Sequence, residues 1–377
     1  MGGDDRPSNT VPPMALAPAA AGLGRVVTLR DVAQRAGVDV STASRALTGR
    51  RRVTPAIAKR VRSAAASLGY SPNVTARNLR MARTMTLGLI FPKLNSPTSL
   101  EFAEGLSSGI EEEGYSLMLT TARGEPEHFR TLVQRLFERR VDALFIATPP
   151  DLGTTLQAYE NAGVPVLVLF ARGLGPESLP LFTAMEDEAL RQAAARLAAL
   201  GHRREIYFGM PQSVPSVRTT WLQHSAERSG LTLTIEMVPH EEHHAGLYDR
   251  VARHLTVTDR ATVFFSDLSV LPRLMHVLNQ MGLRIPADLS LVAFGESPWT
   301  LEFGVPIASI SHDMLQLGRL AAATILDWLQ GSRPADVVSV GGGVWVERDS
   351  IGPAPPQTVQ RATPIAESIA GSNRGSH

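Results

Sequence analysis

Near the start of the chain, hydrophobic positions recur with the period of an α-helix. Four of them fall at i, i+3, i+4 and i+7 and predict a helix with one apolar face. They are Leu29, Val32, Ala33 and Ala36. Thr28 precedes them as a suitable N-cap, and Gly37 follows as a residue that can turn the chain without a Cβ penalty.

Two further short helices are predicted in the same region. The first covers residues 40–48, with Ala43, Ala46 and Leu47 on its inner face. The second begins at Thr54 and Pro55, an N-cap followed by proline at the first helical position. Its apolar positions are Ile57, Val61, Ala64, Ala65 and Leu68. Helix, glycine turn, short helix and third helix form the pattern of a helix-turn-helix, whose second helix fits the major groove of DNA.

A short segment follows the third helix. Ser71 and Pro72 end that helix, and residues 73–80 have the length of about two helical turns. Eight residues are too few to hold a helix in isolation. We therefore expect this segment to be disordered in the free protein and to fold when it docks on DNA.

The remaining pattern alternates between apolar runs of strand length and longer helical stretches. The predicted strands cover residues 86–91, 116–120, 143–147, 166–170, 206–209, 231–238, 262–266 and 289–294. The predicted helices cover residues 101–113, 127–139, 187–200, 216–229 and 268–281. Apolar strands separated by helices indicate parallel sheets with helices on both faces. At this length we expect two lobes, with a ligand in the cleft at the carboxyl ends of the strands.

Composition excludes several classes of protein. The 377 residues are 44% hydrophobic and 19% charged, as in globular proteins, and none is cysteine, which excludes disulfides, thiolate metal sites and cysteine nucleophiles. No apolar run approaches the ~20 residues of a membrane helix. Asp4 and Asp5 stand where an export signal carries positive charge. We expect a cytoplasmic protein without a membrane partner.

Charge is distributed unevenly along the chain. The formal net charge is +1, but residues 28–83 contain twelve basic and two acidic side chains, so this segment carries +10 and the rest of the chain −9. A short basic domain on an acidic body is typical of a protein that binds nucleic acid, because cationic side chains release the counterions condensed on the polyanion.

The basic segment resembles the DNA-binding domain of the LacI/GalR (lactose-repressor) family. The match runs through TLRDVAQRAGVDVSTASR at residues 28–45 and continues to residue 80, with Asp39 for the usual serine and Ala43 for the usual valine. Further phrases of the family are RRVDALFI at 139–146, LGHRREIYF at 200–208 and ERDS at 347–350. The resemblance covers about residues 26–352.

The resemblance implies an α/β protein with an N-terminal all-α helix-turn-helix domain and a two-lobed, periplasmic-binding-protein-like body with parallel sheets. Five regions follow from it. They are a disordered arm (1–25), the DNA-binding domain (26–72), a hinge helix (73–83), the effector-binding and dimerisation domain (84–352) and a disordered tail (353–377).

The resemblance also implies which residues contact DNA. They are Thr28, Val40, Ser41, Thr42, Ser44, Arg45, Asn73, Ala76, Arg77, Leu79 and Arg80. Val40, Ser41 and Arg45 would face base edges, with Arg45 suited to bidentate bonds to guanine, while Thr42 and Ser44 would hold phosphates. In the hinge helix, Ala76 would lie in the minor groove and Leu79 would wedge into a base step. The alternative is that Leu79 packs on the body.

Five residues are expected to bind the effector. They are Ser96, Thr98, Arg218, Asp267 and Glu296. Arg218 stands where the family keeps an arginine that clamps ligand oxygens, which a guanidinium fork suits. Asp267 stands for the aspartate of the family's Asn-Asp pair. The alternative for these two residues is a surface ion pair.

Other positions depart from the family. Ser96, Pro97, Thr98 and Ser99 replace Asn-Pro-Phe-Phe and would remove an aromatic wall, Trp221 replaces a glycine, and Glu296 is a candidate to replace a deleted carboxylate. Asp187 is expected to cap a helix rather than to contact ligand. An altered sugar pocket follows, and we expect a sugar or another small polar metabolite as the effector.

One string in the sequence matches an enzymatic motif. Residues 240–244, HEEHH, match the zinc-protease string H-E-x-x-H, which needs both histidines on one helix. Pro239 directly precedes this polar run, so a solvated loop is the favoured interpretation. The chain has no phosphate-binding loop, dinucleotide fingerprint or Gly-x-Ser-x-Gly elbow. We expect no enzymatic activity, no cofactor and no metal.

The first hypothesis is therefore a transcriptional regulator, with a repressor as the favoured form. It would bind a pseudo-palindromic operator as a homodimer and respond to a small effector. The second keeps the DNA-binding dimer but makes the body a ligand-independent scaffold or a surface for a protein partner. A plain sugar-binding protein conflicts with the basic segment and the missing export signal.

Overall fold

The computed structural model describes residues 27–48, 53–70, 83–147, 149–170, 178–211, 217–239, 243–255 and 262–356. The chain divides into two units, Met1–Met81 and Ala82–His377, called here the head and the body. None of the helices in these described ranges is long and apolar enough to span a membrane.

The head contains the three predicted helices, α1 (Leu29–Ala36), α2 (Val40–Thr48) and α3 (Pro55–Ser67). Thr28 and Asp31 form a reciprocal capping box at the start of α1, and Gly37 ends it in the left-handed conformation at φ 61°. The helices close on a small core of Val32, Ala33, Ala36, Ala43, Ala46, Val61, Ala64 and Ala65. The helix-turn-helix prediction is confirmed.

One detail of the head differs from the prediction. Thr54 occupies the N-cap position of α3, but its side chain makes no capping hydrogen bond, and Pro55 at the first position sets the start of the helix. The hinge segment lies outside the described residues, so the roles of Asn73, Ala76, Arg77, Leu79 and Arg80 stay predictions.

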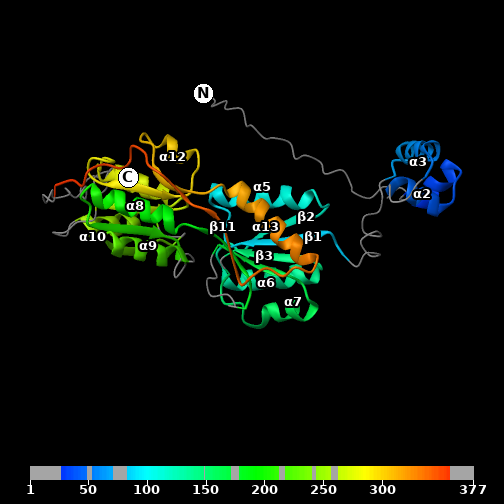
Figure 1. Ribbon diagram of the computed structural model, residues 1–377, viewed down its shortest axis with the longest axis horizontal. Helices are drawn as coiled ribbons and strands as arrows, with labels where there is room; N and C mark the ends of the chain where they lie inside the picture. The colour runs from blue at the N-terminus through cyan, green and yellow to red at the C-terminus, as the bar shows by residue number, and fades with distance from the viewer. Residues whose placement is uncertain are drawn as a thin grey trace, which may run out of the picture. The chain divides into compact units, whose positions relative to one another are not determined.

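The body has two lobes, each built on a six-stranded sheet (Figure 1). The first sheet has the order β11-β5-β4-β3-β1-β2, and its paired strands are parallel. Its strands are β1 (Thr86–Phe91), β2 (Ser116–Thr121), β3 (Ala143–Ala147), β4 (Val166–Leu169), β5 (Leu181–Met185) and β11 (Val337–Gly342).

The second sheet has the order β12-β10-β9-β8-β6-β7. Its strands are β6 (Arg204–Gly209), β7 (Thr232–Met237), β8 (Val263–Asp267), β9 (Ser290–Phe294), β10 (Ala308–Ser311) and β12 (Val344–Val346). β12 runs antiparallel to β10, and the other described pairs are parallel. Eleven of the twelve described strands are therefore parallel to their neighbours, in two open sheets of the kind that the apolar runs predict.

Helices cover both faces of each sheet. In the first lobe they are α5 (Pro97–Glu111), α6 (Pro126–Glu138), the 3-10 turn η1 (Gly153–Leu156), α7 (Gln157–Ala162) and α13 (Met314–Leu329). In the second lobe they are α8 (Asp187–Ala199), α9 (Val217–Arg228), α10 (His244–Leu255), α11 (Leu271–Gln280) and α12 (Trp299–Glu302). The apolar core accordingly falls into two clusters in each lobe, one on either side of the sheet.

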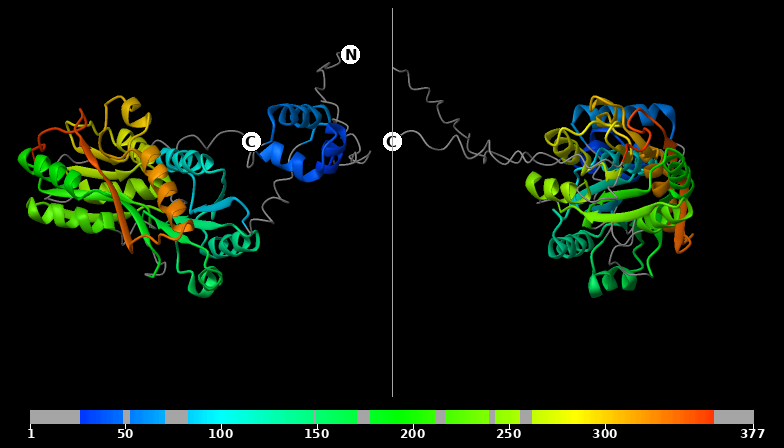
Figure 2. Two further views of the ribbon diagram at one scale, coloured as in Figure 1. Left: turned by 45° about the vertical axis from the view of Figure 1, so that its right-hand side comes forward. Right: turned by 90° about the vertical axis from the view of Figure 1, so that its left-hand side faces the viewer.

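The chain passes between the lobes three times. It leaves the first lobe after β5, returns after β10 and leaves again after β11 to add β12 to the second sheet. The last passage is the orange-to-red segment in Figure 2. Three segments therefore join the two lobes, and residues from both lobes line one cavity.

Candidate functional site

Helix α2 presents to solvent the residues that the sequence assigned to base edges. Ser41 and Arg45 are exposed, and Val40 is 42% exposed despite its apolar side chain. Ala43 and Ala46 on the opposite side are buried in the head core. Thr42 and Ser44 are half-buried beside the exposed row. The outer face of α2 can therefore enter a groove without disturbing the core.

Asp39 organises this face. Its Oδ1 accepts hydrogen bonds from the Ser41 hydroxyl at 2.6 Å and the Thr42 amide at 2.8 Å, and its Oδ2 accepts one from the Thr42 hydroxyl at 2.6 Å. The bonds from Ser41 and then Thr42 hold the pKa of the Asp39 carboxyl well below its usual range. Asp39 thus caps α2 as an ionised carboxylate.

Arg45 is tied to the same network. Its Nη2 donates to the Ser41 and Thr42 hydroxyls, both at 3.0 Å, and its Nε donates to the Ser41 carbonyl at 3.2 Å. These bonds hold an exposed guanidinium on the outer face of α2. Thr28, also assigned to DNA, uses its side chain in the capping box of α1 and is exposed there.

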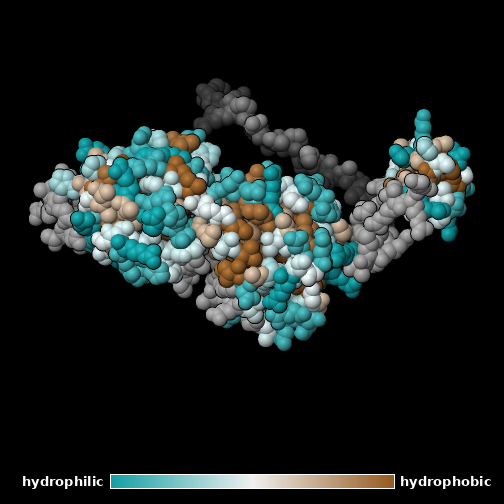
Figure 3. All heavy atoms as spheres, viewed as in Figure 1, coloured by the Kyte–Doolittle hydropathy of each residue, from teal (hydrophilic) through white to brown (hydrophobic). Residues whose placement is uncertain are grey.

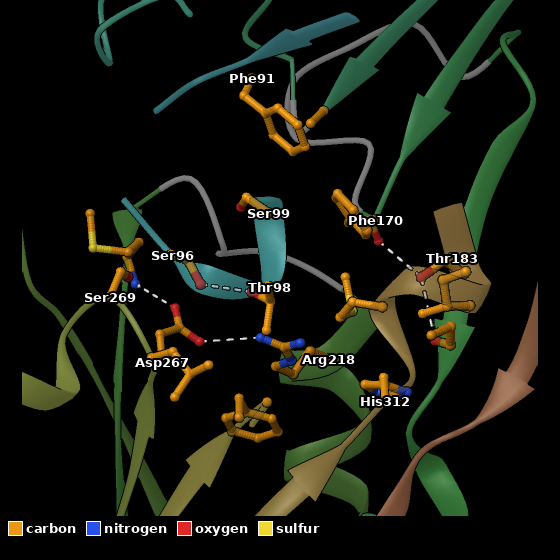
Figure 4. Close-up of a pocket in the computed structure, with 18 of the residues that line it drawn as sticks. Phe91, Ser96, Thr98, Ser99, Phe170, Thr183, Arg218, Asp267, Ser269 and His312 are labelled. Atoms are coloured by element: carbon orange, nitrogen blue, oxygen red, sulfur yellow. Dashed lines mark hydrogen bonds and ion pairs between the residues drawn. The ribbon is translucent and has the colours of Figure 1, made fainter. Parts of the chain in front are cut away.

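The body contains a cavity of about 230 Å³ where the carboxyl ends of both sheets meet. Phe91 ends β1 and Ala147 ends β3 on one side, while Asp267 ends β8 and Phe294 ends β9 on the other. This is the edge at which open parallel sheets bind ligands. Figure 4 shows the lining side chains pointing into this space from both lobes.

Aromatic side chains line the cavity, although residues 96–99 supply none of them. Phe91 and Phe170 lie stacked with ring centroids 6.4 Å apart, and Trp221 and Phe294 also belong to the lining. Phe170 follows β4 in the left-handed conformation at φ 66°, which is costly for an aromatic residue and turns its ring beside Phe91. Strand ends and Trp221 of α9 therefore supply the aromatic wall, while the start of α5 supplies hydroxyl groups.

Arg218 forms an ion-pair network at the centre of the cavity lining. Its Nε and Nη2 donate to the two carboxylate oxygens of Glu186 at 2.7 and 2.6 Å, and its Nη1 donates to Asp267 Oδ1 at 3.2 Å. The guanidinium also lies 4.4 Å from the centroid of the Phe294 ring. The Glu186 side chain is 6% exposed, that of Asp267 10% and that of Arg218 31%, so the ion pair exists but lies in the cavity lining rather than on the open surface.

Further donors complete the network around the two carboxylates. Tyr207 donates its hydroxyl to Asp267 Oδ1 at 2.7 Å, and the Met210 amide donates to Oδ2 at 3.1 Å. His312 Nε2 lies 3.0 Å from Glu186 Oε1 and donates to it, because an ionised carboxylate only accepts.

Electrostatics keeps the central pair ionised. Burial alone raises the pKa of Glu186, but the charge of Arg218 and the hydrogen bonds from His312 and Arg218 outweigh it and lower this pKa to about 2. Burial also lowers the pKa of Arg218. The nearby Glu186 carboxylate outweighs this effect and raises the pKa of Arg218 well above its usual value. Both groups therefore stay charged across the physiological range.

Four of the five expected effector residues line the cavity. Ser96 and Thr98 lie there with their hydroxyl oxygens 2.7 Å apart, near Arg218 and Asp267 (Figure 4). Glu296 does not line it. Its carboxylate accepts a hydrogen bond from Ser309 at 2.6 Å and pairs with Arg348.

The prediction for Asp187 as a helix cap is wrong by one residue. Glu186 occupies the N-cap position of α8 and is buried in the cavity lining, while Asp187 is the first helical residue and is exposed. Sequence reasoning also missed His312. Glu186 directly follows β5 and His312 directly follows β10, two strands that the apolar pattern did not predict, so nothing marked these residues as strand ends.

The HEEHH string contributes no metal site to the described part of the chain, where no cluster of histidine and carboxylate side chains is arranged to hold a metal ion. Residues 240–242 lie outside the described ranges. His244 begins α10, and its ring lies 4.6 Å from that of His276 on α11.

The basic three-helix head exposes a helix that carries an arginine, and the body has a cavity between two parallel-sheet lobes. These two features define the class of DNA-binding regulators with a two-lobed ligand-binding body. Comparisons with known families agree. Residues 28–73 match the family of bacterial regulatory proteins of the lacI family, and residues 194–351 match the periplasmic binding protein-like domain.

Relatives extend the match over most of the chain. The HTH-type transcriptional regulator CelR of Thermobifida fusca is 31% identical over 319 residues, which are 81% of this chain and 92% of the relative. The ribose operon repressor of Haemophilus influenzae is 26% identical over 310 residues, 80% of this chain and 91% of the relative. The chain belongs to the LacI family.

Solved structures share the fold. A lac repressor dimer bound to operator and the anti-inducer ONPF matches with a TM-score of 0.73 and 23% identity, covering 86% of this chain and 98% of that one. A complex of the transcriptional regulator CelR with cellobiose matches with a TM-score of 0.60 and 24% identity, covering 86% and 99%. The α/β fold with a helical head and two parallel-sheet lobes is confirmed.

Proposed function

We propose that the protein is a transcriptional repressor that binds a pseudo-palindromic operator as a homodimer under the control of a small polar effector. The observation that carries the proposal is the pairing of two sites in one chain. The exposed face of α2 carries Arg45 and Ser41, and the cavity lies at the strand ends of both lobes. The relatives named as an operon repressor and as a complex with cellobiose support the two roles.

The cavity favours an effector over a scaffold role for the body. A ligand that contacts both lobes makes different contacts in each arrangement of the lobes, so it binds the two arrangements with different affinity. Only such a difference in affinity lets a ligand shift the equilibrium between two conformations. Coupling of ~1–3 kcal/mol would change operator affinity by about 5–150-fold. We infer binding and no catalysis, because the Glu186 and Asp267 carboxylates are held by Arg218.

The DNA-binding role is tested with a matched pair of arginine variants. Duplexes selected from a random library by the purified protein provide the operator. Arg45→Ala should remove preference for a G·C pair in each half-site, at a cost of ~1–3 kcal/mol, because a bidentate contact to guanine is lost. Arg60→Ala, an exposed arginine on α3, should leave the order of preference unchanged. The proposal fails if Arg45→Ala keeps the wild-type order of preference.

The effector role is tested by thermal-shift screening of neutral sugars and related metabolites. A compound that raises the melting temperature of the body should also change the affinity for the selected duplex. A compound that shifts melting without any effect on DNA binding would instead support the scaffold alternative.

A further inference from the structure

Arg218, the one arginine among the described residues that line the cavity, is already occupied by carboxylates of the protein. Three of its nitrogens donate to Glu186 and Asp267 at distances of 2.6 to 3.2 Å. Its contact with Glu186 is the bidentate fork that an arginine would otherwise offer to a ligand carboxylate or phosphate. An anionic ligand would have to displace Glu186 from this fork.

Glu186 is fixed in this position from several directions. It stands between β5 and α8, its residue is 4% exposed, and His312 holds the Oε1 oxygen at 3.0 Å in addition to Arg218. It therefore acts as a built-in anion next to the cavity rather than as a mobile surface group.

The described residues of the remaining lining offer no surplus of positive charge. Besides Arg218 its basic side chains are Lys93 and His312, and His312 already contacts Glu186. With the histidine counted as neutral, Lys93 and Arg218 balance Glu186 and Asp267 in formal charge. The other polar groups are neutral amides and hydroxyls, and four aromatic rings supply apolar surface. The neutral groups are Asn95, Ser96, Thr98, Ser99, Thr183 and Ser269, and the rings are those of Phe91, Phe170, Trp221 and Phe294.

We propose that Glu186 is a specificity-determining residue, which neutralises Arg218 and restricts the cavity to uncharged ligands that carry hydroxyl groups beside an apolar face. This inference rests on the proposed effector role of the cavity and narrows the class of effector. Carboxylate and phosphate forms of an otherwise suitable compound are rejected for two reasons. They would lie beside the buried carboxylates of Glu186 and Asp267, and the guanidinium donors of Arg218 are already bonded to those carboxylates.

Inorganic sulfate is the probe that tests this filter, at constant ionic strength and with calorimetry and Trp221 fluorescence as the readouts. The wild-type protein should show no saturable sulfate binding that depends on Arg218. Glu186→Gln should gain sulfate binding at least about tenfold tighter than wild type, because the fork of Arg218 becomes available. Glu186→Gln combined with Arg218→Gln should lose that gain.

Matched controls separate the fork from a general change in charge. Glu188→Gln makes the same chemical change two residues away, on an exposed carboxylate paired with Arg191, and should behave as wild type. Glu186→Asp keeps the charge and should still exclude sulfate, which keeps the test decisive if Glu186→Gln does not fold.

Two results overturn the inference. One is saturable sulfate binding to the wild-type cavity that Arg218→Gln abolishes. The other is a folded Glu186→Gln protein that gains no anion binding. Neither result depends on DNA, and affinity for the selected duplex is measured separately on the same proteins. If the wild-type protein showed no sequence-specific DNA binding, the proposed function would fail. The inference about Glu186 would still be decided by the sulfate data.

Discussion

At the scale of single residues, the functional groups are set by hydrogen bonds that sequence patterns do not reveal. Arg218 and Asp267 were found through the family resemblance, since each matches a position of its motif. Their partner Glu186 was missed because β5, which ends just before it, was not predicted, and because the acidic residues 186 and 187 look alike in sequence. Packing against Arg218 and His312 distinguishes them, and it joins residues more than 30 and 120 positions apart.

Glu205 is a second buried acid, and it predicts a pH dependence of stability. It lies in β6 with 1% exposure, and its Oε2 has no hydrogen-bond partner within the described part of the chain. Burial raises its pKa from 4.5 to about 8. Between these two pH values, Glu205 is therefore protonated in the folded protein and ionised in the unfolded chain.

Stability should consequently fall as the pH rises from about 5 to about 8, by up to ~1.4 kcal/mol per pH unit from this residue. Glu205→Gln removes this ionisation, so the variant lacks the loss of stability that comes from residue 205. The free energy of unfolding of the variant minus that of wild type should therefore increase as the pH rises across that window. Urea unfolding at a series of pH values measures the difference. Parallel pH profiles for the two proteins would contradict the assignment.

At the scale of elements, strands made almost wholly of apolar residues were predictable, and two strands that include polar residues were not. The runs at β1, β3 and β9 are fully apolar or nearly so, and the predicted bounds agree with the structure within one residue. β5 and β10 hold five and four residues and include polar Thr183, Ser309 and Ser311, so their burial comes from neighbouring strands. Helix α13 was also missed, although it is 16 residues long.

α13 belongs with α5 in space rather than in sequence. The two helices pack side by side on one face of the first sheet (Figure 1). A Cβ added at Gly105 would lie 2.0 Å from the Leu315 carbonyl oxygen, and one at Gly318 would lie 2.2 Å from the Phe102 carbonyl oxygen. Glycine is required at this crossing because the two backbones touch.

Gly105→Ala should therefore destabilise the body by about 1–3 kcal/mol or more, since the obstacle is backbone and cannot rotate away. Gly342→Ala provides the control, because no atom lies within 4 Å of the added Cβ there. Calorimetric melting of the two variants measures the contrast. A Gly105→Ala protein as stable as Gly342→Ala would show that the helices are not in close contact.

At the scale of the whole molecule, exposed apolar side chains indicate a subunit interface. Leu100 on α5 is 54% exposed and Leu301 on α12 56%, with Leu119 and Trp299 also exposed in the same two lobes. Hydrophobic side chains also gather near the middle of the face seen in Figure 3, in the lobe that carries α13. Contiguous exposed apolar surface marks sites of protein association, so we expect these side chains to contribute to the dimer interface.

Leu100→Glu combined with Leu301→Glu should weaken self-association, because each charge would be buried at the interface. Sedimentation should show a shift from dimer to monomer, and affinity for a two-half-site operator should fall with it. Val337→Glu, on β11 at 51% exposure, is the control for an added charge on an exposed apolar residue. An unchanged dimer in the double variant would place the interface elsewhere.

The central claim is that the head reads DNA sequence through the outer face of α2. The most direct measurement is the affinity of the purified protein for its selected pseudo-palindromic duplex relative to a scrambled duplex, at near-physiological salt. A specific reader of this kind should prefer the selected duplex by at least about 10³-fold. Equal affinity for the two duplexes would contradict the claim and leave the head as a basic surface without sequence preference.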